Sequence, residues 1–191
     1  MKALRNLMIR LRQFRRGEDG VAAVEFALIL VPMLLLYIGA MEASTLISMD
    51  RRVQSVSGAV GDLVARSDTT ITAAMLTDYF RASGGIITPF PLAGLKQVVT
   101  QLQVSTDGKT AKVVWSRQYV NGIYGVGTDY PLNTLYPLRQ AMIDVSKGKS
   151  VIVAEASYSY LPLYGIVIDK PIPLYRENFF LPRFGGTITV N

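Results

Sequence analysis

The longest apolar stretch of the chain runs from Val21 to Met41 and holds one charged residue, Glu25. A helix of roughly 20 apolar residues crosses the hydrocarbon core of a bilayer, so this stretch predicts a transmembrane helix. Beyond Glu42, apolar residues recur at spacings of three and four, which is the pattern of one packed helix face. They are Leu46, Met49, Val53, Val56, Val60 and Leu63. Together the two patterns predict one unbroken helix from Val21 to about Arg66.

The second half of the chain shows the alternation of apolar and polar residues that is typical of β-strands. From residue 95 to 118 the alternation surrounds Asp107-Gly108, which predicts a tight β-hairpin. We expect Trp115, on the returning strand, to pack on the long helix. The apolar residues of that strand are Ala111, Val113 and Trp115.

Two further regions of the second half carry strand signals. Residues 150–161 predict a strand, and a last pair of strands is expected near residues 178–181 and 187–190. One face of the strand at 150–161 is expected to hold Ile152, Ala154, Ala156, Tyr158 and Tyr160. These strands and the hairpin predict one mainly antiparallel sheet.

Shorter elements are expected between the long helix and the strands. A second helix is predicted over Ile71 to Arg81, with Asp68 or Thr70 as its cap. The glycine-rich residues 121–127 lack the spacing of a dinucleotide fingerprint and are interpreted as a surface loop. A short helix is expected within residues 135–145, with Asp129 as a cap or turn residue.

The predicted fold class is α+β, with a long N-terminal transmembrane and stem helix packed on a C-terminal, mainly antiparallel β domain. The sequence divides into a basic leader over residues 1–20, a transmembrane helix over 21–41, a helical extension over 42–66 and an α+β domain over 67–191. At 191 residues the chain has room for one modest domain beside one membrane helix.

The charge of the chain is concentrated before the apolar stretch. Six basic and two acidic side chains precede Val21, which gives +4 of the total of +6, so residues 21–191 carry only +2. Excess basic charge marks the cytoplasmic end of a membrane helix, so the leader is expected in the cytoplasm and the domain on the far side of the inner membrane, in the periplasm. The leader suits a basic amphipathic helix that lies on the inner leaflet of the membrane. Its apolar residues are Leu4, Leu7, Met8, Leu11 and Phe14. With the remaining charge so low, we expect no nucleic-acid partner.

The residue types present argue against most catalytic and metal sites. The chain has no cysteine and no histidine, which removes disulfides and the commonest zinc and triad arrangements. Acidic residues of the domain are scattered singly, with no pair at the spacing of a known carboxylate motif. We therefore expect no enzyme, no cofactor and no metal.

Glu25 is the unusual residue of the apolar stretch. An ionised side chain at the centre of a membrane helix costs about 2.5 to 3.5 kcal/mol, and less near the interface. One interpretation is that Glu25 reaches the near headgroups and has no further role. The other is that a cut after Gly20 frees a new amine at Val21, which pairs with Glu25 of a neighbouring chain because the amine and carboxylate of one chain lie too far apart.

The segment Gly20-Val-Ala-Ala-Val-Glu-Phe26, after a basic leader, resembles the class III signal of type IV pilins and pseudopilins. The pair Glu25-Phe26 is similar to that of Flp and TadE-like proteins of the tight-adherence (Tad) pilus system. The resemblance covers roughly residues 15–41. It implies that a membrane aspartic prepilin peptidase cuts between Gly20 and Val21, and that Glu25 guides assembly. The length of the chain agrees with a TadE-like minor pseudopilin and its pilin-like domain.

Three functions remain open on the sequence alone. The first is a minor pseudopilin that is cleaved after Gly20 and packs through its stem with other pilins of a Tad-type pilus or secretion apparatus. The second is an uncleaved single-pass membrane protein whose domain is an adaptor or scaffold in the same machinery. The third is a membrane-anchored enzyme, which would need a polar cleft with perturbed carboxylates. A cleaved secretory signal ending near Ala40 or Ala43 is disfavoured because the apolar stretch is too long.

Overall fold

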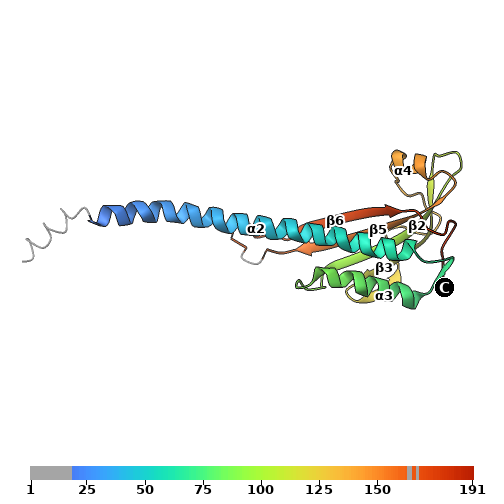
Figure 1. Cartoon of the computed structure of the whole chain (residues 1–191), viewed down its shortest axis with the longest axis horizontal. Helices are drawn as coiled ribbons and strands as arrows, with labels where there is room; N and C mark the ends of the chain where they lie inside the picture. The colour runs from blue at the N-terminus through green and yellow to red at the C-terminus, as the bar shows by residue number, and fades with distance from the viewer. Residues whose placement is uncertain (1–18, 163–164, 167) are drawn as a thin grey trace, which may run out of the picture.

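The computed structural model describes residues 19–162, 165–166 and 168–191. Most of the predicted basic leader, residues 1–18, lies outside the described residues. Helix α2 (Asp19–Ala65) is continuous over 47 residues and contains Pro32. At a rise of roughly 1.5 Å per residue it is about 70 Å long. Its N-terminal half extends away from the domain as a single rod (Figure 1), which confirms the prediction of one unbroken helix.

A five-stranded antiparallel sheet forms the domain, in the order β4-β3-β2-β5-β6. A second, two-stranded sheet pairs β1 with β7 in parallel. The fold class is therefore α+β, as predicted. The strands are β1 (Thr70–Ile71), β2 (Leu95–Val104), β3 (Ala111–Val120), β4 (Ile123–Val126), β5 (Ser150–Tyr160), β6 (Ile172–Phe180) and β7 (Thr189–Val190).

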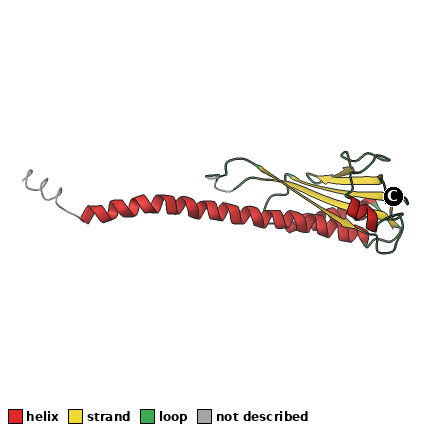
Figure 2. Cartoon of the chain, turned by 90° about the horizontal axis from the view of Figure 1, so that it is seen from above, coloured by secondary structure: helices red, strands yellow, loops and turns green. Residues whose placement is uncertain are grey.

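Helices cover one face of the five-stranded sheet (Figure 2). The C-terminal half of α2 packs along β5 and β6, while α3 (Ala73–Gly84) lies beside it and is followed by the short 3₁₀ helix η1 (Gly85–Ile87). The large apolar side chains that α2 buries are Met49, Val53, Val56, Val60 and Val64. Trp115 lies in the same buried cluster as Val60 and Val64, together with Leu76 and Phe80 of α3. Burial of this apolar seam is the main force that holds helix and sheet together.

Helix α2 lies very close to the sheet at Gly61. A Cβ atom built there would lie 2.3 Å from Phe180 Cε2 and 2.8 Å from the Cβ of Ala154. No side chain fits into that space, so glycine is required by the packing of α2 on β5 and β6. Gly58, one turn earlier, differs because its Cβ would meet only Asn178 Nδ2, at 3.8 Å.

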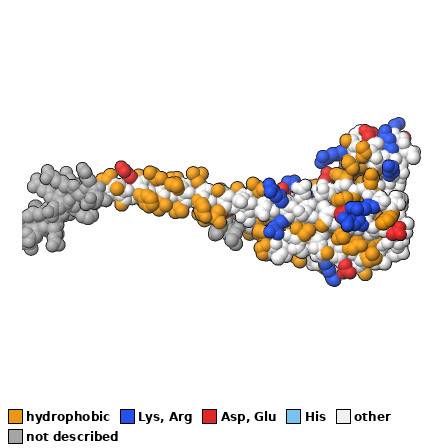
Figure 3. Space-filling view, viewed as in Figure 1, with side chains coloured by type: hydrophobic (Ala, Val, Ile, Leu, Met, Phe, Trp, Pro, Cys, Tyr) orange, Lys and Arg blue, Asp and Glu red, His pale blue; other side chains and the backbone are white. Residues whose placement is uncertain are grey.

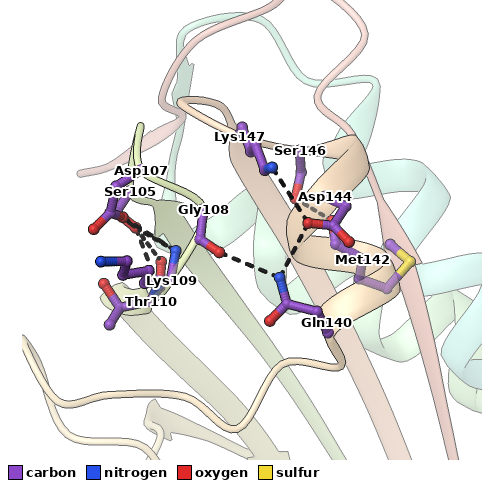
Figure 4. Close-up of polar contacts among 10 residues, drawn as sticks. All are labelled: Ser105, Asp107, Gly108, Lys109, Thr110, Gln140, Met142, Asp144, Ser146 and Lys147. Carbon is purple, nitrogen blue, oxygen red and sulfur yellow. Dashed lines mark hydrogen bonds and ion pairs between the residues drawn. The ribbon is translucent and has the colours of Figure 1, made fainter.

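The opposite face of the sheet has its own, smaller core. The chain between β4 and β5 includes α4 (Gln140–Val145) and covers the half of this face that lies farther from the projecting part of α2. It buries Tyr136, Leu138 and Ile143. Figure 4 shows how the turn of the β2-β3 hairpin meets α4: Gln140 Nε2 donates to the Gly108 carbonyl at 3.3 Å and to Asp144 at 3.0 Å. These contacts close the end of the domain that lies farthest from the apolar half of α2.

The predicted hairpin of β2 and β3 is confirmed. However, Trp115 does not lie on the same face of β3 as Ala111 and Val113, although simple alternation would place all three on one face. Gln101 pairs with Trp115 and Leu102 with Val113, so Val114 is an extra residue in β3. Such a bulge reverses the alternation. Ala111 and Val113 therefore belong to the core under α4, whereas Trp115 faces the helices and donates its indole N–H to Gln101 Oε1 at 3.0 Å.

Several shorter predictions are wrong in detail. No strand pair joins residues 178–181 to 187–190, because β6 pairs with β5 and β7 pairs with β1. Thr72 caps α3 by accepting the N–H of Met75 at 3.2 Å, in place of Asp68 or Thr70. Part of the expected loop at 121–127 is β4, and the helix expected within 135–145 is shortened to α4. Asp129, which was expected to be a cap or turn residue, forms an ion pair with Lys96. In contrast to these details, the strand predicted at residues 150–161 is confirmed as β5.

The contact at Gly61 predicts opposite effects for two similar substitutions in α2. Gly61→Ala forces the new methyl group into Phe180 and Ala154 and should lower the free energy of unfolding by about 1 to 3 kcal/mol. Gly58→Ala meets no close atom and should be neutral or stabilising by up to about 1 kcal/mol, because alanine favours helix over glycine. Thermal unfolding of the full chain in detergent, followed by the fluorescence of Trp115, measures both. Equal effects of the two substitutions would contradict the proposed close approach.

Candidate functional site

The predicted processing and assembly residues lie at the start of α2. The side chains of Val21 and Phe26 are 53% and 64% exposed, and Glu25 is exposed as well. A Cβ at Gly20 would meet nothing within 4 Å. In the part of the chain that the structure describes, no salt bridge involves Glu25. These four residues therefore form an accessible segment that is open to a protease or to a neighbouring chain.

The surface of α2 after Gly20 is apolar on every side. This helix is the one candidate membrane span in the described residues, and the best window within it has a mean hydropathy of 2.5 with none of its residues buried. Hydrophobic side chains cover the projecting half of the helix on the face seen in Figure 3. An apolar surface that is so extensive needs a cover, and a length of about 20 residues matches that of a lipid bilayer. The helix therefore fits a membrane anchor.

Above the apolar run, small residues line the face of α2 that points away from the sheet. They border an open groove with a volume of about 810 Å³. Its lining includes Ile47 and the exposed Arg51. The small residues of the groove are Ala40, Ala43, Ser44, Ser48 and Ser55. Because their side chains are short, another helix could approach the backbone of α2 closely along this face.

Glu42 is the first residue after the apolar run and is almost completely buried, with 2% of its surface exposed. Its Oε1 accepts the N–H of Ile166 at 3.2 Å, and its Oε2 accepts the N–H of Ile168 at 3.1 Å. Both partners belong to the connection between β5 and β6. The carboxylate thus joins two parts of the chain that are more than a hundred residues apart in sequence.

Glu155, on the outer face of β5, is the second buried carboxylate and is 5% exposed. Its Oε1 accepts the hydroxyl of Tyr130 at 2.9 Å and that of Tyr175. Its Oε2 has no hydrogen-bond partner among the described residues. Tyr175 also donates to Glu177, which is opposite Glu155 in the register of β5 and β6. The folded chain therefore brings two acids together that the sequence gives as isolated residues.

Burial governs the protonation of this cluster. Desolvation raises the pKa of Glu155, the hydrogen bonds from Tyr175 and Tyr130 oppose that rise, and the charge of Glu177 adds to it. Desolvation and the nearby Glu155 also raise the pKa of Tyr130 to about 12 and that of Tyr175 further. The tyrosines are therefore hydroxyl donors at neutral pH.

The space next to Glu155 is small. A pocket of about 110 Å³ is bordered by Glu155, Tyr175 and Ser157, and by the ion pair of Lys96 Nζ with Asp129 Oδ2 at 2.6 Å. Within the described residues no group of three acidic, histidine or cysteine side chains is arranged to hold a metal ion. The buried acid accepts two tyrosine hydroxyls from neighbouring segments, so its arrangement suits a polar support of the sheet.

A larger, mostly apolar pocket of about 380 Å³ lies between α3 and the strands β2 and β3. Phe80, Leu92 and Leu95 supply its apolar lining. Arg81 stands at its edge and donates its Nε–H to the hydroxyl of Tyr119 at 3.3 Å. This pocket is remote from Gly20 and Glu25 along the chain and contains no pair of acids.

Sequence reasoning found the residues at the start of α2 and missed Glu42 and Glu155 as structural centres. For Glu42 the local sequence gives no signal, because both partners come from the connection between β5 and β6. For Glu155 one signal is present: an acid among the apolar residues of a strand must find hydrogen-bond donors if it is buried.

The raised pKa of Glu155 predicts a pH-dependent effect of Glu155→Gln. Since the folded chain holds the proton more tightly than the unfolded chain, the stability linked to neutral Glu155 is present below the usual pKa of about 4.3 and is lost as the pH rises through the raised pKa. Glutamine stays neutral. The unfolding temperature of Glu155→Gln should therefore rise relative to that of the unaltered chain as the pH increases from about 4.

The control for this measurement is Asp78→Asn, on the exposed surface of α3. Its unfolding temperature, relative to the unaltered chain, should change little with pH. If the difference for Glu155→Gln were equally flat, Glu155 would not be protonated more readily in the folded chain.

The family described as TadE-like protein matches residues 20–60, from Gly20 through the apolar run and most of the stem. No curated protein and no solved structure matches the chain. The match begins at the glycine of the predicted processing signal and includes Glu25 and Phe26. Over residues 20–60 the chain is similar to the TadE-like family, and the apolar helix that carries these residues fits a membrane anchor.

Proposed function

We propose that the chain is a minor pseudopilin that a prepilin peptidase cuts after Gly20 and that takes part in assembly of a Tad-type pilus or secretion apparatus. In this proposal the leader faces the cytoplasm, the domain lies in the periplasm, and the chain itself catalyses no reaction. The observation that carries the proposal is the combination of a TadE-like segment at residues 20–60 with an apolar helix surface that the domain leaves uncovered.

The peptidase step is supported by the accessibility of Gly20. Among the described residues, no atom beyond the adjoining residues and the local helix backbone lies within 4 Å of the position where its Cβ would be, so this side of Gly20 is open to a protease. Gly20 is helical in α2, whereas a protease cleft takes extended backbone. Glycine lowers the cost of unwinding because it favours the helix by about 1 kcal/mol less than alanine. The start of α2 is therefore suited to local opening.

The assembly step uses the exposed carboxylate of Glu25. After cleavage the ammonium of Val21 is the charge of opposite sign at the same end of the helix. A neighbouring chain that is displaced along the helix axis can bring its Val21 ammonium to Glu25, and each pair removes the cost of an isolated charge in lipid. The groove above the span, lined by short side chains from Ala40 to Ser55, supports close packing of a second pilin helix.

An uncleaved adaptor is the second candidate function. One observation favours it: Gly20 and Val21 are part of a continuous helix that begins at Asp19. In that case Glu25 would remain near the headgroups, and the domain would be a fixed periplasmic scaffold. The two candidates differ in the N-terminus of the mature chain.

Substitution of Gly20 tests the processing step. Gly20→Leu should leave a precursor that retains residues 1–20, because a bulky side chain blocks the extended backbone in the protease cleft. Gly20→Ala should be cut in part. Gly17→Leu, in the leader, is the matched control and should be cut as the unaltered chain is. Intact mass of the membrane-extracted protein reads the outcome, and full cleavage of Gly20→Leu would rule out the proposed site.

Substitution of Glu25 tests the pairing of charges. Glu25→Ala and Glu25→Gln should be cut normally but should no longer associate with other pilus components, whereas Glu25→Asp keeps the charge and should retain part of the association. Crosslinking of membranes followed by purification of the chain measures this. Normal association of Glu25→Gln would disprove a role for the carboxylate charge.

A further inference from the structure

The connection between β5 and β6 lies beside α2 at the point where the apolar run ends. We give the name β5-β6 loop to its described residues, which are 161–162, 165–166 and 168–171. The end of the sheet from which it leaves is the end nearest the projecting, apolar half of α2 in both views (Figures 1 and 2). The loop is thus the part of the domain that is closest to the anchor.

Glu42 fixes the loop to the helix. Both of its oxygens accept backbone N–H groups of the loop, from Ile166 at 3.2 Å and from Ile168 at 3.1 Å. Hydrogen bonds to an ionised acceptor are stronger than those between neutral groups. The side chain is 2% exposed, so the loop covers it. The height of the loop along α2 is therefore set by the position of Glu42.

That position coincides with the membrane boundary. From Val21 to Met41 a helix rises about 30 Å, which is the thickness of the hydrocarbon core. If this segment fills the core, Glu42 lies at the level of the headgroups. The N–H groups that it binds, and hence Ile166, lie at the same level within a few ångströms.

The side chains of the loop suit that environment. Leu161 and Ile166 are 60% and 55% exposed, although both are large and apolar. Asp169 and Lys170 follow at exposed positions and cancel in charge. Apolar side chains with a polar border partition into the boundary between headgroups and acyl chains. Since the loop has no net basic charge, burial of apolar surface, and not attraction to anionic lipid, is the driving force.

We infer that the β5-β6 loop is a second membrane contact, in which Leu161 and Ile166 enter the headgroup region of the bilayer that holds α2, and Glu42 keeps the loop at that depth. With one anchor a domain can tilt relative to the plane of the bilayer. A second contact on one side of the helix restricts that tilt and sets the side toward which α2 leans in the membrane. The inference depends on the membrane anchor alone and does not require cleavage at Gly20 or a pilus.

Because the chain has no cysteine, a single labelled position can test the inference. The full chain carrying Ile166→Cys is labelled with the environment-sensitive dye NBD and reconstituted into phosphatidylcholine vesicles. The control is Leu132→Cys, which is also apolar and 64% exposed but belongs to the segment between β4 and β5 at the other end of the domain. Quenching by nitroxide-labelled lipid is compared with quenching by iodide present on both sides of the membrane.

The expected result at Ile166→Cys is a blue-shifted emission that lipid nitroxides quench and iodide does not, with the reverse pattern at Leu132→Cys. Equal iodide quenching at the two positions would overturn the inference. Protection of Ile166→Cys from both quenchers would also overturn it, because protein and not lipid would then cover the loop.

A second variant tests the part played by Glu42. Glu42→Ala, combined with Ile166→Cys, should lose the lipid quenching, while the fluorescence of Trp115 verifies that the domain is folded. Unchanged lipid quenching in a folded Glu42→Ala chain would contradict the assignment of Glu42 as the residue that holds the loop.

Discussion

The packing of the C-terminal half of α2 on β5 and β6 is the contact on which the rest of the structure depends. It buries a continuous apolar seam from Met49 to Val64, and Gly61 permits the backbone of the helix to approach Ala154 and Phe180. Without this seam the sheet would expose the face that carries Ile152 and Ala156. Because the same helix continues into the apolar, projecting half, one unbroken helix joins the domain to the candidate membrane anchor.

One helix therefore meets two different environments. From Gly20 on, its N-terminal half is exposed and apolar except for Glu25, whereas its C-terminal half is apolar on the side of the sheet. The groove on its outer side combines short side chains with Ile47, Arg51 and Arg52. Glu42 marks the transition between the two halves and is satisfied by the backbone of the β5-β6 loop. Two acids of the helix differ accordingly: Glu42 accepts hydrogen bonds within its own chain, while Glu25 is exposed and forms no salt bridge among the described residues.

Much of the fold follows from local sequence patterns. The unbroken helix, the β2-β3 hairpin and strand β5 are each written in a periodicity that spans ten or more residues. Contacts between distant segments carry no such signal. The pairing of β7 with β1, the bulge at Val114 and the hydrogen bonds of Glu42 all depend on segments brought together by folding, and two-residue strands are too short to show alternation. For the site, Glu25 was predicted because it is the one charge within the apolar run and Gly20 because it directly precedes that run, whereas Glu155 looks like any other acid until the strands pair.

The measurement that tests the account most directly is the N-terminus of the membrane-extracted chain, determined by intact mass and peptide sequencing in cells with and without the prepilin peptidase. The account predicts a chain that begins at Val21 when the peptidase is present and at Met1 when it is absent. A chain that begins at Met1 in both cells would contradict processing at Gly20 and would leave an uncleaved, membrane-anchored adaptor in its place.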